Sequence, residues 1–231
     1  MPLHFDYKEF GDRRNRLLEL MTGSELDGML IFRQESMFYL TGYDTFGYVF
    51  FQCLFLGGDG KLILLTRVPD LRQAQNTSIV KDIRIWVDGP EVNPALQLKE
   101  ILREYGCAGK RLGVEYDSYG LTAKNGKMLD SALDGFCELI DASGMVNRLR
   151  VVKSPEELVY VRKAAELADD ALDEAHRLVK DGCDEGELLA AMQGAVFKGG
   201  GDYPGNEFII GSGENALLCR YFSGRRKLDP E

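Results

Sequence analysis

Histidine and cysteine are the residue types that most often hold metals or act as nucleophiles, and this chain has few of either. It contains two histidines, His4 and His176, and five cysteines. Neither a C-x-x-C nor an H-E-x-x-H motif occurs, so the spacing shows no pattern for a zinc site. An odd number of cysteines, several in apolar surroundings, is typical of reduced thiols in a cytoplasmic protein. We therefore expect no metal site among these residues.

The stretch 47–57 (GYVFFQCLFLG) carries two polar side chains within an apolar run. On a strand, Tyr48, Phe50 and Gln52 would share one face. Phe50 fits an ordinary buried strand, whereas the buried polar tips of Tyr48 and Gln52 would each require a hydrogen-bond partner. The sequence leaves open whether that partner is internal or a ligand.

The elements that would position these side chains alternate between helix and strand over the first 150 residues. Apolar residues at helical spacing predict helices at 7–22, 93–105 and 119–133. Short apolar runs predict strands at 27–33, 47–57, 61–67, 83–87, 111–116 and 136–141. Gly-Asp-Gly at 58–60 predicts a hairpin between two of these strands. Residues 1–150 are therefore expected to form an α/β domain, a mixed sheet flanked by helices.

The pattern changes after residue 150. Ser154 and Pro155 form a helix start, and the helix is expected to run to about residue 180. A second helix follows to about residue 198, and the glycine-rich stretch 199–218 encloses one probable strand, Phe208-Ile209-Ile210. Two helices and one strand cannot close an independent sheet domain, so we expect 151–231 to be part of something larger.

Charge and composition exclude several classes of function. The formal net charge is −9, which disfavours nucleic-acid binding because phosphate recognition needs a basic surface. No apolar run approaches the roughly 20 residues of a membrane-spanning helix, and the N-terminus does not have the pattern of a secretory signal. With 45% hydrophobic and 28% charged residues, the composition is that of an ordinary globular protein. We predict a cytoplasmic location, with neither nucleic acid nor membrane as a partner.

Three segments, taken in order, resemble the signatures of a known family. Residues 37–43 (MFYLTGY) are similar to an N-terminal motif of the creatinase/prolidase/aminopeptidase P family, the pita-bread hydrolases of peptidase class M24. Residues 148–157 (RLRVVKSPEE), followed by RKAA at 162–165, resemble the entry to that family's catalytic domain. Residues 211–216 (GSGENA) resemble the loop that precedes its catalytic histidine. The order and spacing of the three motifs make the combination specific.

The resemblance implies a fold and an activity. Residues 1–150 would be the creatinase-like N-terminal domain, and 151–231 the beginning of a pita-bread α+β catalytic domain, truncated here. The full-length protein would hydrolyse C–N bonds of the Xaa-Pro peptidase type, in a small peptide or small amide substrate. Family chains pair so that one subunit's N-terminal domain helps to cover its neighbour's active site, which implies a homodimer.

The same resemblance implies how metal would be bound. Metal-dependent members hold two Mn, Co or Zn ions through two aspartates, a histidine and two glutamates, all located after the GSGENA-like loop. No such position lies within this chain, so a divalent metal is expected only in the full-length protein. The chain alone is expected to be inactive.

Site residues follow from the resemblance, together with one departure from it. Cys219 stands where the family has its histidine and is the catalytic candidate by position, although a thiol with a pKa near 8.5 cannot replace imidazole without help. A small buried residue is the alternative interpretation. Asp202 and Tyr203, within GGDYP, resemble members that hydrolyse ectoine-like or creatine-like substrates, although a tight turn would also explain the glycines. Tyr48 and Gln52 complete the substrate-binding candidates.

Two alternative functions stay open. One is a metal-independent amidohydrolase similar to creatinase or ectoine hydrolase. The other is a non-catalytic binding module of the same fold, which the cysteine in the histidine position slightly favours.

Overall fold

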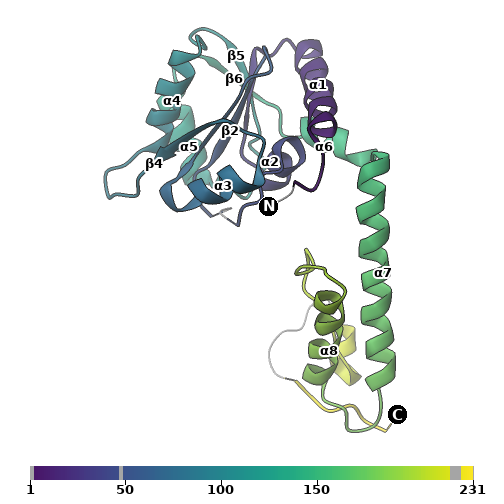
Figure 1. Cartoon of the computed structure of the whole chain (residues 1–231). Coiled ribbons are helices and arrows are strands. Elements are labelled where there is room, and N and C mark those ends of the chain that lie inside the picture. Colours follow the sequence, from purple (N-terminus) through teal and green to yellow (C-terminus); the bar gives the residue numbers. More distant parts are fainter. Residues whose placement is uncertain (1–2, 47–48, 219–224, 231) are drawn as a thin grey trace. The chain divides into compact units, whose positions relative to one another are not determined.

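The computed structural model describes residues 3–46, 49–218 and 225–230. The chain divides into two compact units, Met1–Val152 and Lys153–Glu231, which are described separately (Figure 1). Among the described residues, none of the helices combines the length and the apolar character needed to cross a membrane.

A six-stranded mixed sheet forms the centre of the first unit, with strand order β4-β3-β2-β1-β5-β6. Its strands are β1 (Gly28–Ile31), β2 (Cys53–Gly57), β3 (Leu62–Arg67), β4 (Asp82–Trp86), β5 (Arg111–Val114) and β6 (Glu138–Asp141). β2 runs antiparallel to both of its neighbours, whereas the β3–β4, β1–β5 and β5–β6 pairs are parallel. Five strands therefore point the same way, and their carboxyl ends share one edge of the sheet.

Helices cover both faces of this sheet (Figure 1). Side chains of α4 (Pro94–Glu104) and α5 (Ala123–Leu133) belong to the apolar core on one face. Side chains of α1 (Tyr7–Gly23), α2 (Gln34–Thr41), α3 (Leu71–Thr77) and α6 (Met145–Val151) belong to the core on the other face. A short 3-10 turn, Val68–Asp70, precedes α3. The predicted α/β class with helices on a mixed sheet is confirmed.

The second unit is built on two helices, α7 (Pro155–Leu178) and α8 (Glu185–Lys198). Ser154 begins α7 with a capping box in which its side chain and that of Glu157 each accept the other residue's backbone N–H. Leu167 and Ala171 of α7 are buried, as are Leu188 and Val196 of α8. A 3-10 turn over Gly213–Leu217 follows, and an isolated antiparallel bridge joins Asp184 to Lys227.

Some elements differ from the sequence-based expectation. β2 begins at Cys53 rather than near residue 47, so Phe50 and Gln52 precede the strand instead of alternating along it. The expected strand at 208–210 is not formed within the described residues, because its backbone has no neighbouring strand there to pair with. Helix α2 was not expected, since its short stretch is rich in residues common in strands.

Candidate functional site

Polar residues of the first unit gather where the five parallel strands end. In open α/β sheets, this carboxyl edge is where ligands usually bind. The loop that enters the antiparallel strand β2 lies at the same edge, because β2 starts where its neighbours end.

A hydrogen-bonded group of three side chains occupies the centre of this edge. The hydroxyl of Tyr43 donates to Oε1 of Gln52 at 2.7 Å, and the hydroxyl of Thr66 donates to the same oxygen at 2.8 Å. All three residues are buried. Burial raises the pKa of Tyr43, so its hydroxyl remains a neutral donor at physiological pH. Gln52, one of the substrate-binding candidates, therefore has internal partners for its oxygen, and its contact with substrate stays a prediction.

A fully buried glutamate, Glu115, follows β5 at the same edge. Its Oε2 accepts the backbone N–H groups of Phe32 at 3.2 Å and Arg33 at 2.8 Å, and its Oε1 accepts the hydroxyl of Ser36 at 2.5 Å. Phe32 and Arg33 form the turn between β1 and α2, and Ser36 lies in the first turn of α2. Glu115 thereby fixes the start of the helix that carries most of the MFYLTGY motif. Burial raises the pKa of Glu115, against the effect of these hydrogen bonds.

An arginine supports the loop before β2. The guanidinium of Arg67 lies 3.1 Å from the ring centroid of Phe50, and it pairs with Asp70 at 3.3 Å and with Asp88 at 3.7 Å. Such a cation–π contact holds the loop onto the end of β3.

Large apolar side chains project from the loops of this edge. We call Phe46, Val49, Val87 and Tyr119 the carboxyl-edge surface. Phe46 and Tyr119 are 87% and 89% exposed. The edge thus combines a buried polar framework with exposed apolar side chains.

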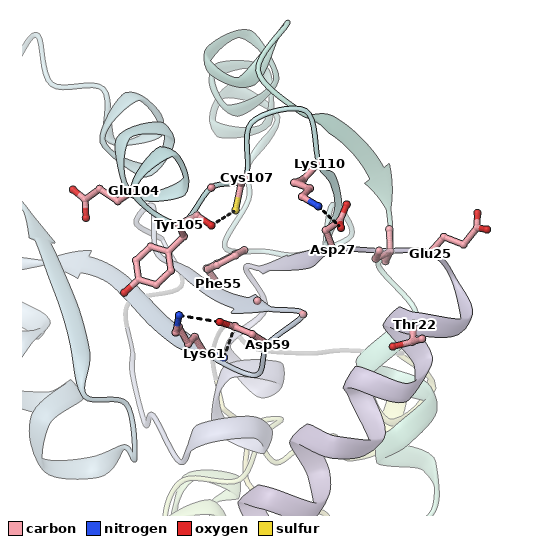
Figure 2. A pocket seen from close by; sticks show the side chains of 14 residues that line it. Thr22, Glu25, Asp27, Phe55, Asp59, Lys61, Glu104, Tyr105, Cys107 and Lys110 are labelled. Carbon is pink, nitrogen blue, oxygen red and sulfur yellow. Dashed lines mark hydrogen bonds and ion pairs between the residues drawn. The ribbon is translucent and has the colours of Figure 1, made fainter.

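The opposite edge of the sheet holds the cleft drawn in Figure 2, with a volume of about 960 Å³. Its acidic side chains are engaged in ion pairs. Lys110 pairs with Asp27 at 3.2 Å and Lys61 with Asp59 at 2.9 Å. Burial raises the pKa of Cys107 to about 11, so this thiol is neutral and a poor nucleophile. The cleft therefore presents neither an unpaired carboxylate nor a reactive thiol among its described side chains.

In the second unit, the GSGENA loop is held by another buried glutamate. Glu185 is the first residue of α8 and has no exposed surface. Its Oε1 accepts both the backbone N–H of Ser212 at 2.9 Å and the hydroxyl of Ser212 at 2.7 Å. Its Oε2 accepts the backbone N–H of Arg226 at 3.2 Å. Burial disfavours the charge, but the hydrogen bonds of Ser212 and Arg226 outweigh it and lower the pKa of Glu185.

The hydrogen-bonded groups described above do not include the other sequence-based candidates. Tyr48 and Cys219 fall outside the described residues. Asp202 and Tyr203 are exposed on the loop after α8, where the Tyr203 ring packs edge-on against Phe197 with centroids 5.0 Å apart. Tyr203 also lines a cavity of about 250 Å³ within the second unit. Their roles stay predictions.

The described residues do not form a donor set for a metal. Across the ranges 3–46, 49–218 and 225–230, no group of three or more histidine, cysteine or acidic side chains is arranged to hold an ion. The described residues therefore do not supply the donors that the family's metal requires.

Sequence reasoning did not single out Glu115 or Glu185. A signal was available for both, since each acid adjoins an element: Glu115 follows the apolar run RLGV, and Glu185 follows the helix cap Asp184. What the sequence lacked was the identity of the donors, which lie 27 to 83 residues away along the chain.

Curated relatives share low but extended similarity with this chain. Ectoine hydrolase from Halomonas elongata is 27% identical over 94% of this chain and 58% of its own length. Xaa-Pro aminopeptidase from Escherichia coli is 28% identical over 93% of this chain and 54% of its own length. The chain thus spans about half the length of the curated relatives it matches.

A solved structure, Xaa-Pro dipeptidase from Bacillus anthracis, shares the fold. It superimposes with a TM-score of 0.77 at 20% identity, covering 95% of this chain and 58% of its own. At this identity the likeness establishes the architecture alone, and it agrees with the pita-bread family that the motifs predicted.

Two family matches account for nearly all of the sequence. Residues 13–152 match the creatinase/prolidase N-terminal domain, and residues 159–231 match metallopeptidase family M24. The resemblance inferred from the three motifs is therefore confirmed: the chain belongs to the creatinase/prolidase family of M24 hydrolases.

Proposed function

We propose that this sequence belongs to a C–N hydrolase of the Xaa-Pro peptidase type. The observation that carries the proposal is the match of residues 159–231 to metallopeptidase family M24, within which the GSGENA loop is held by Glu185. The names of two relatives, an Xaa-Pro aminopeptidase and an Xaa-Pro dipeptidase, support the substrate class. The substrate would be a small peptide.

We propose a divalent metal only for a protein of the relatives' full length. The family is described as metallopeptidases, and the described residues supply no donor set. In a protein of the relatives' length, Mn, Co or Zn would polarise the scissile carbonyl and activate water. The present residues would contribute framework and substrate contacts, and we expect this chain to be inactive when it is alone.

A homodimer is part of the proposal. The carboxyl-edge surface supports it, because exposed aromatic and aliphatic side chains on a rigid, hydrogen-bonded edge are suited to a protein partner. In such a dimer this edge would cover the neighbouring subunit's substrate. The proposed setting is cytoplasmic, with neither nucleic acid nor membrane as a partner.

The test is an assay of the protein in the length in which it is naturally made. We expect Xaa-Pro dipeptides to be cleaved in the presence of Mn²⁺, Co²⁺ or Zn²⁺, and cleavage to cease with a chelator. Sedimentation analysis of the same sample should give a dimer. A monomer that cleaves no Xaa-Pro bond with any of the three ions would contradict the proposal.

A second candidate is an ectoine-hydrolase-like or creatinase-like amidohydrolase that needs no metal. Two observations favour it: the 27% identity to ectoine hydrolase, and the exposed Asp202-Tyr203 pair that prompted the comparison with such enzymes. Opening of the ectoine ring that persists in the presence of a chelator, without Xaa-Pro cleavage, would select this function. The absence of both activities would favour a non-catalytic binding module.

A further inference from the structure

The arrangement of Glu185 at the start of α8 leaves its carboxylate free for long-range contacts. Asp184 caps the helix by accepting the N–H of Gly186 at 2.7 Å. The usual task of an acidic residue in the first turn is therefore already carried out by Asp184. Both oxygens of Glu185 instead contact segments far along the chain, at Ser212 and Arg226.

The backbone of Glu185 repeats the contact to Arg226. Its N–H donates to the carbonyl oxygen of Arg226 at 3.0 Å, while its side chain accepts the N–H of the same residue. On either side, Leu228 donates to Cys183 at 2.9 Å, and Gly182 donates to Leu228 at 3.0 Å. The segment 226–228 is thus fixed to the start of α8 independently of the loop.

The loop in turn fits closely against Arg226. Gly213 has a φ of +55°, and a side chain there would collide with the Arg226 guanidinium. A Cβ on Gly211 would lie 2.7 Å from the carbonyl oxygen of Asn215. Gly211 is therefore required by its close approach to the backbone, and Gly213 by its positive φ.

We propose that Glu185 is a positioning residue that holds the 211–216 loop and the 226–228 segment in one fixed arrangement. Its catalytic significance rests on the hydrolase function proposed above, because that loop is one of the three family motifs. The anchoring itself does not depend on that function.

The ionised carboxylate suits this task, since every group that contacts it is a donor. Protonation would place a hydrogen on one oxygen and oppose either the Ser212 or the Arg226 contact. The charged groups around it are Asp184 on α8, Arg226 with its partner Asp229, Lys227 at the bridge to Asp184, Arg225 near Gly186, and Glu214 in the loop. Glu187, two residues further along α8, is exposed and makes neither contact.

The experiment measures hydrogen-exchange protection of the Ser212 and Arg226 amides by NMR, in the unmodified protein, Glu185→Gln and the control Glu187→Gln. We expect Glu185→Gln to reduce protection about tenfold or more at one or both amides, as for a lost charge-assisted hydrogen bond. The control should be unchanged. Protection should also fall in the unmodified protein as acid protonates Glu185, whereas the Glu185→Gln protein should show no such dependence on pH.

Three results would overturn the proposal: full protection in Glu185→Gln, an equal loss in Glu187→Gln, or protection in the unmodified protein that persists through the titration of Glu185. Amides of Leu167 and Ala171 on α7 show whether the helix pair itself stays folded. If Glu185→Gln loses those as well, Ser212→Ala is used instead, and it should weaken the loop amides alone. If the protein is inactive but the loop amides show the expected losses, the proposed function is contradicted and the anchoring proposal is not.

Discussion

Glu115 and Glu185 each have no exposed surface, and each accepts one serine hydroxyl and two backbone N–H groups. Despite this similar set of donors, the pKa of Glu115 is raised and that of Glu185 is lowered. Glu115 lies at the end of a central strand between two large apolar cores, whereas few side chains are buried in the second unit as described. The amount of surrounding protein, rather than the number of donors, decides whether the pKa of the glutamate is raised or lowered.

The comparison also separates two structural uses of a buried carboxylate. Glu115 completes a preformed core and fixes the turn that starts α2. Glu185 joins a helix start to two segments far along the chain. Removing the first should therefore destabilise a whole domain, whereas removing the second should release a local region.

The largest effect is expected from Glu115→Ala. The change leaves the N–H groups of Phe32 and Arg33 and the hydroxyl of Ser36 without their buried acceptor, which should lower the free energy of unfolding of the first unit by about 3 kcal/mol. Urea unfolding followed by the fluorescence of Trp86, the one tryptophan of the chain, measures it.

Two further variants show whether the loss in Glu115→Ala comes from the hydrogen bonds. Glu115→Gln keeps one acceptor oxygen and should be less destabilising than alanine. The exposed Glu104, which pairs with Arg84 at 3.3 Å, is the control, and Glu104→Ala should change stability by about 0.5 kcal/mol or less. If Glu115→Ala were no more destabilising than this control, the turn before α2 would not depend on the carboxylate.

Gln52→Ala should have the next largest effect, about 2 kcal/mol on the same transition. Both the Tyr43 and Thr66 hydroxyls would lose the oxygen that they share, within a buried site. Gln75→Ala, on the exposed face of α3, provides the matched control. Unaltered stability in Gln52→Ala would instead favour the ligand-contact interpretation of Gln52.

The motifs and their spacing predicted the family and the class of fold, but not the framework around the site. Strands 61–67 and 83–87 and the hairpin at 58–60 followed from local patterns, since apolar runs and turn glycines act over a few residues. Gln52 was correctly expected to need a partner, yet the sequence could not choose between an internal partner and a ligand. Its partner Thr66 is brought to it by the pairing of β2 with β3, and its partner Tyr43 by the loop that follows α2.

The helix α7 shows why burial was harder to predict than helicity. Val161, Ala168 and Leu172 recur at helical spacing and would indicate an apolar face, but the residues buried on α7 are Leu167 and Ala171. Alanine-rich helices have apolar residues on more than one face, so the face that packs depends on where α8 lies.

Acid should act on the two units in opposite senses. The lowered pKa of Glu185 contributes stability that is present above its unfolded value of 4.5 and is lost as the pH falls through the folded pKa. The raised pKa of Glu115 contributes stability that is complete below 4.5 and is lost as the pH rises through its folded pKa. Each unit of pKa shift corresponds to about 1.4 kcal/mol.

Amide exchange recorded between pH 7 and pH 3 measures both trends after correction for the intrinsic exchange rate. Protection of the Ser212 amide should fall toward pH 3. At the Phe32 amide, protection in the unmodified protein is compared with protection in Glu115→Gln, and the ratio of the first to the second should rise toward pH 3. Parallel losses at the two sites would mean that general acid unfolding outweighs the individual glutamates.

The smallest effect is expected from paired removal of the serine hydroxyls. Ser36→Ala deletes the hydroxyl contact to Oε1 of Glu115 at 2.5 Å, whereas Ser212→Ala leaves the Ser212 backbone N–H on Oε1 of Glu185 at 2.9 Å. We therefore expect a loss of about 1 kcal/mol for Ser36→Ala, by urea unfolding, and a smaller loss of loop protection for Ser212→Ala. Because a hydroxyl donor lowers the pKa of a carboxylate, both variants should raise the pKa of their glutamate, as measured by NMR titration. If Ser212→Ala weakened its site more than Ser36→Ala, the backbone contact would contribute little, and the loop would depend on the side chain alone.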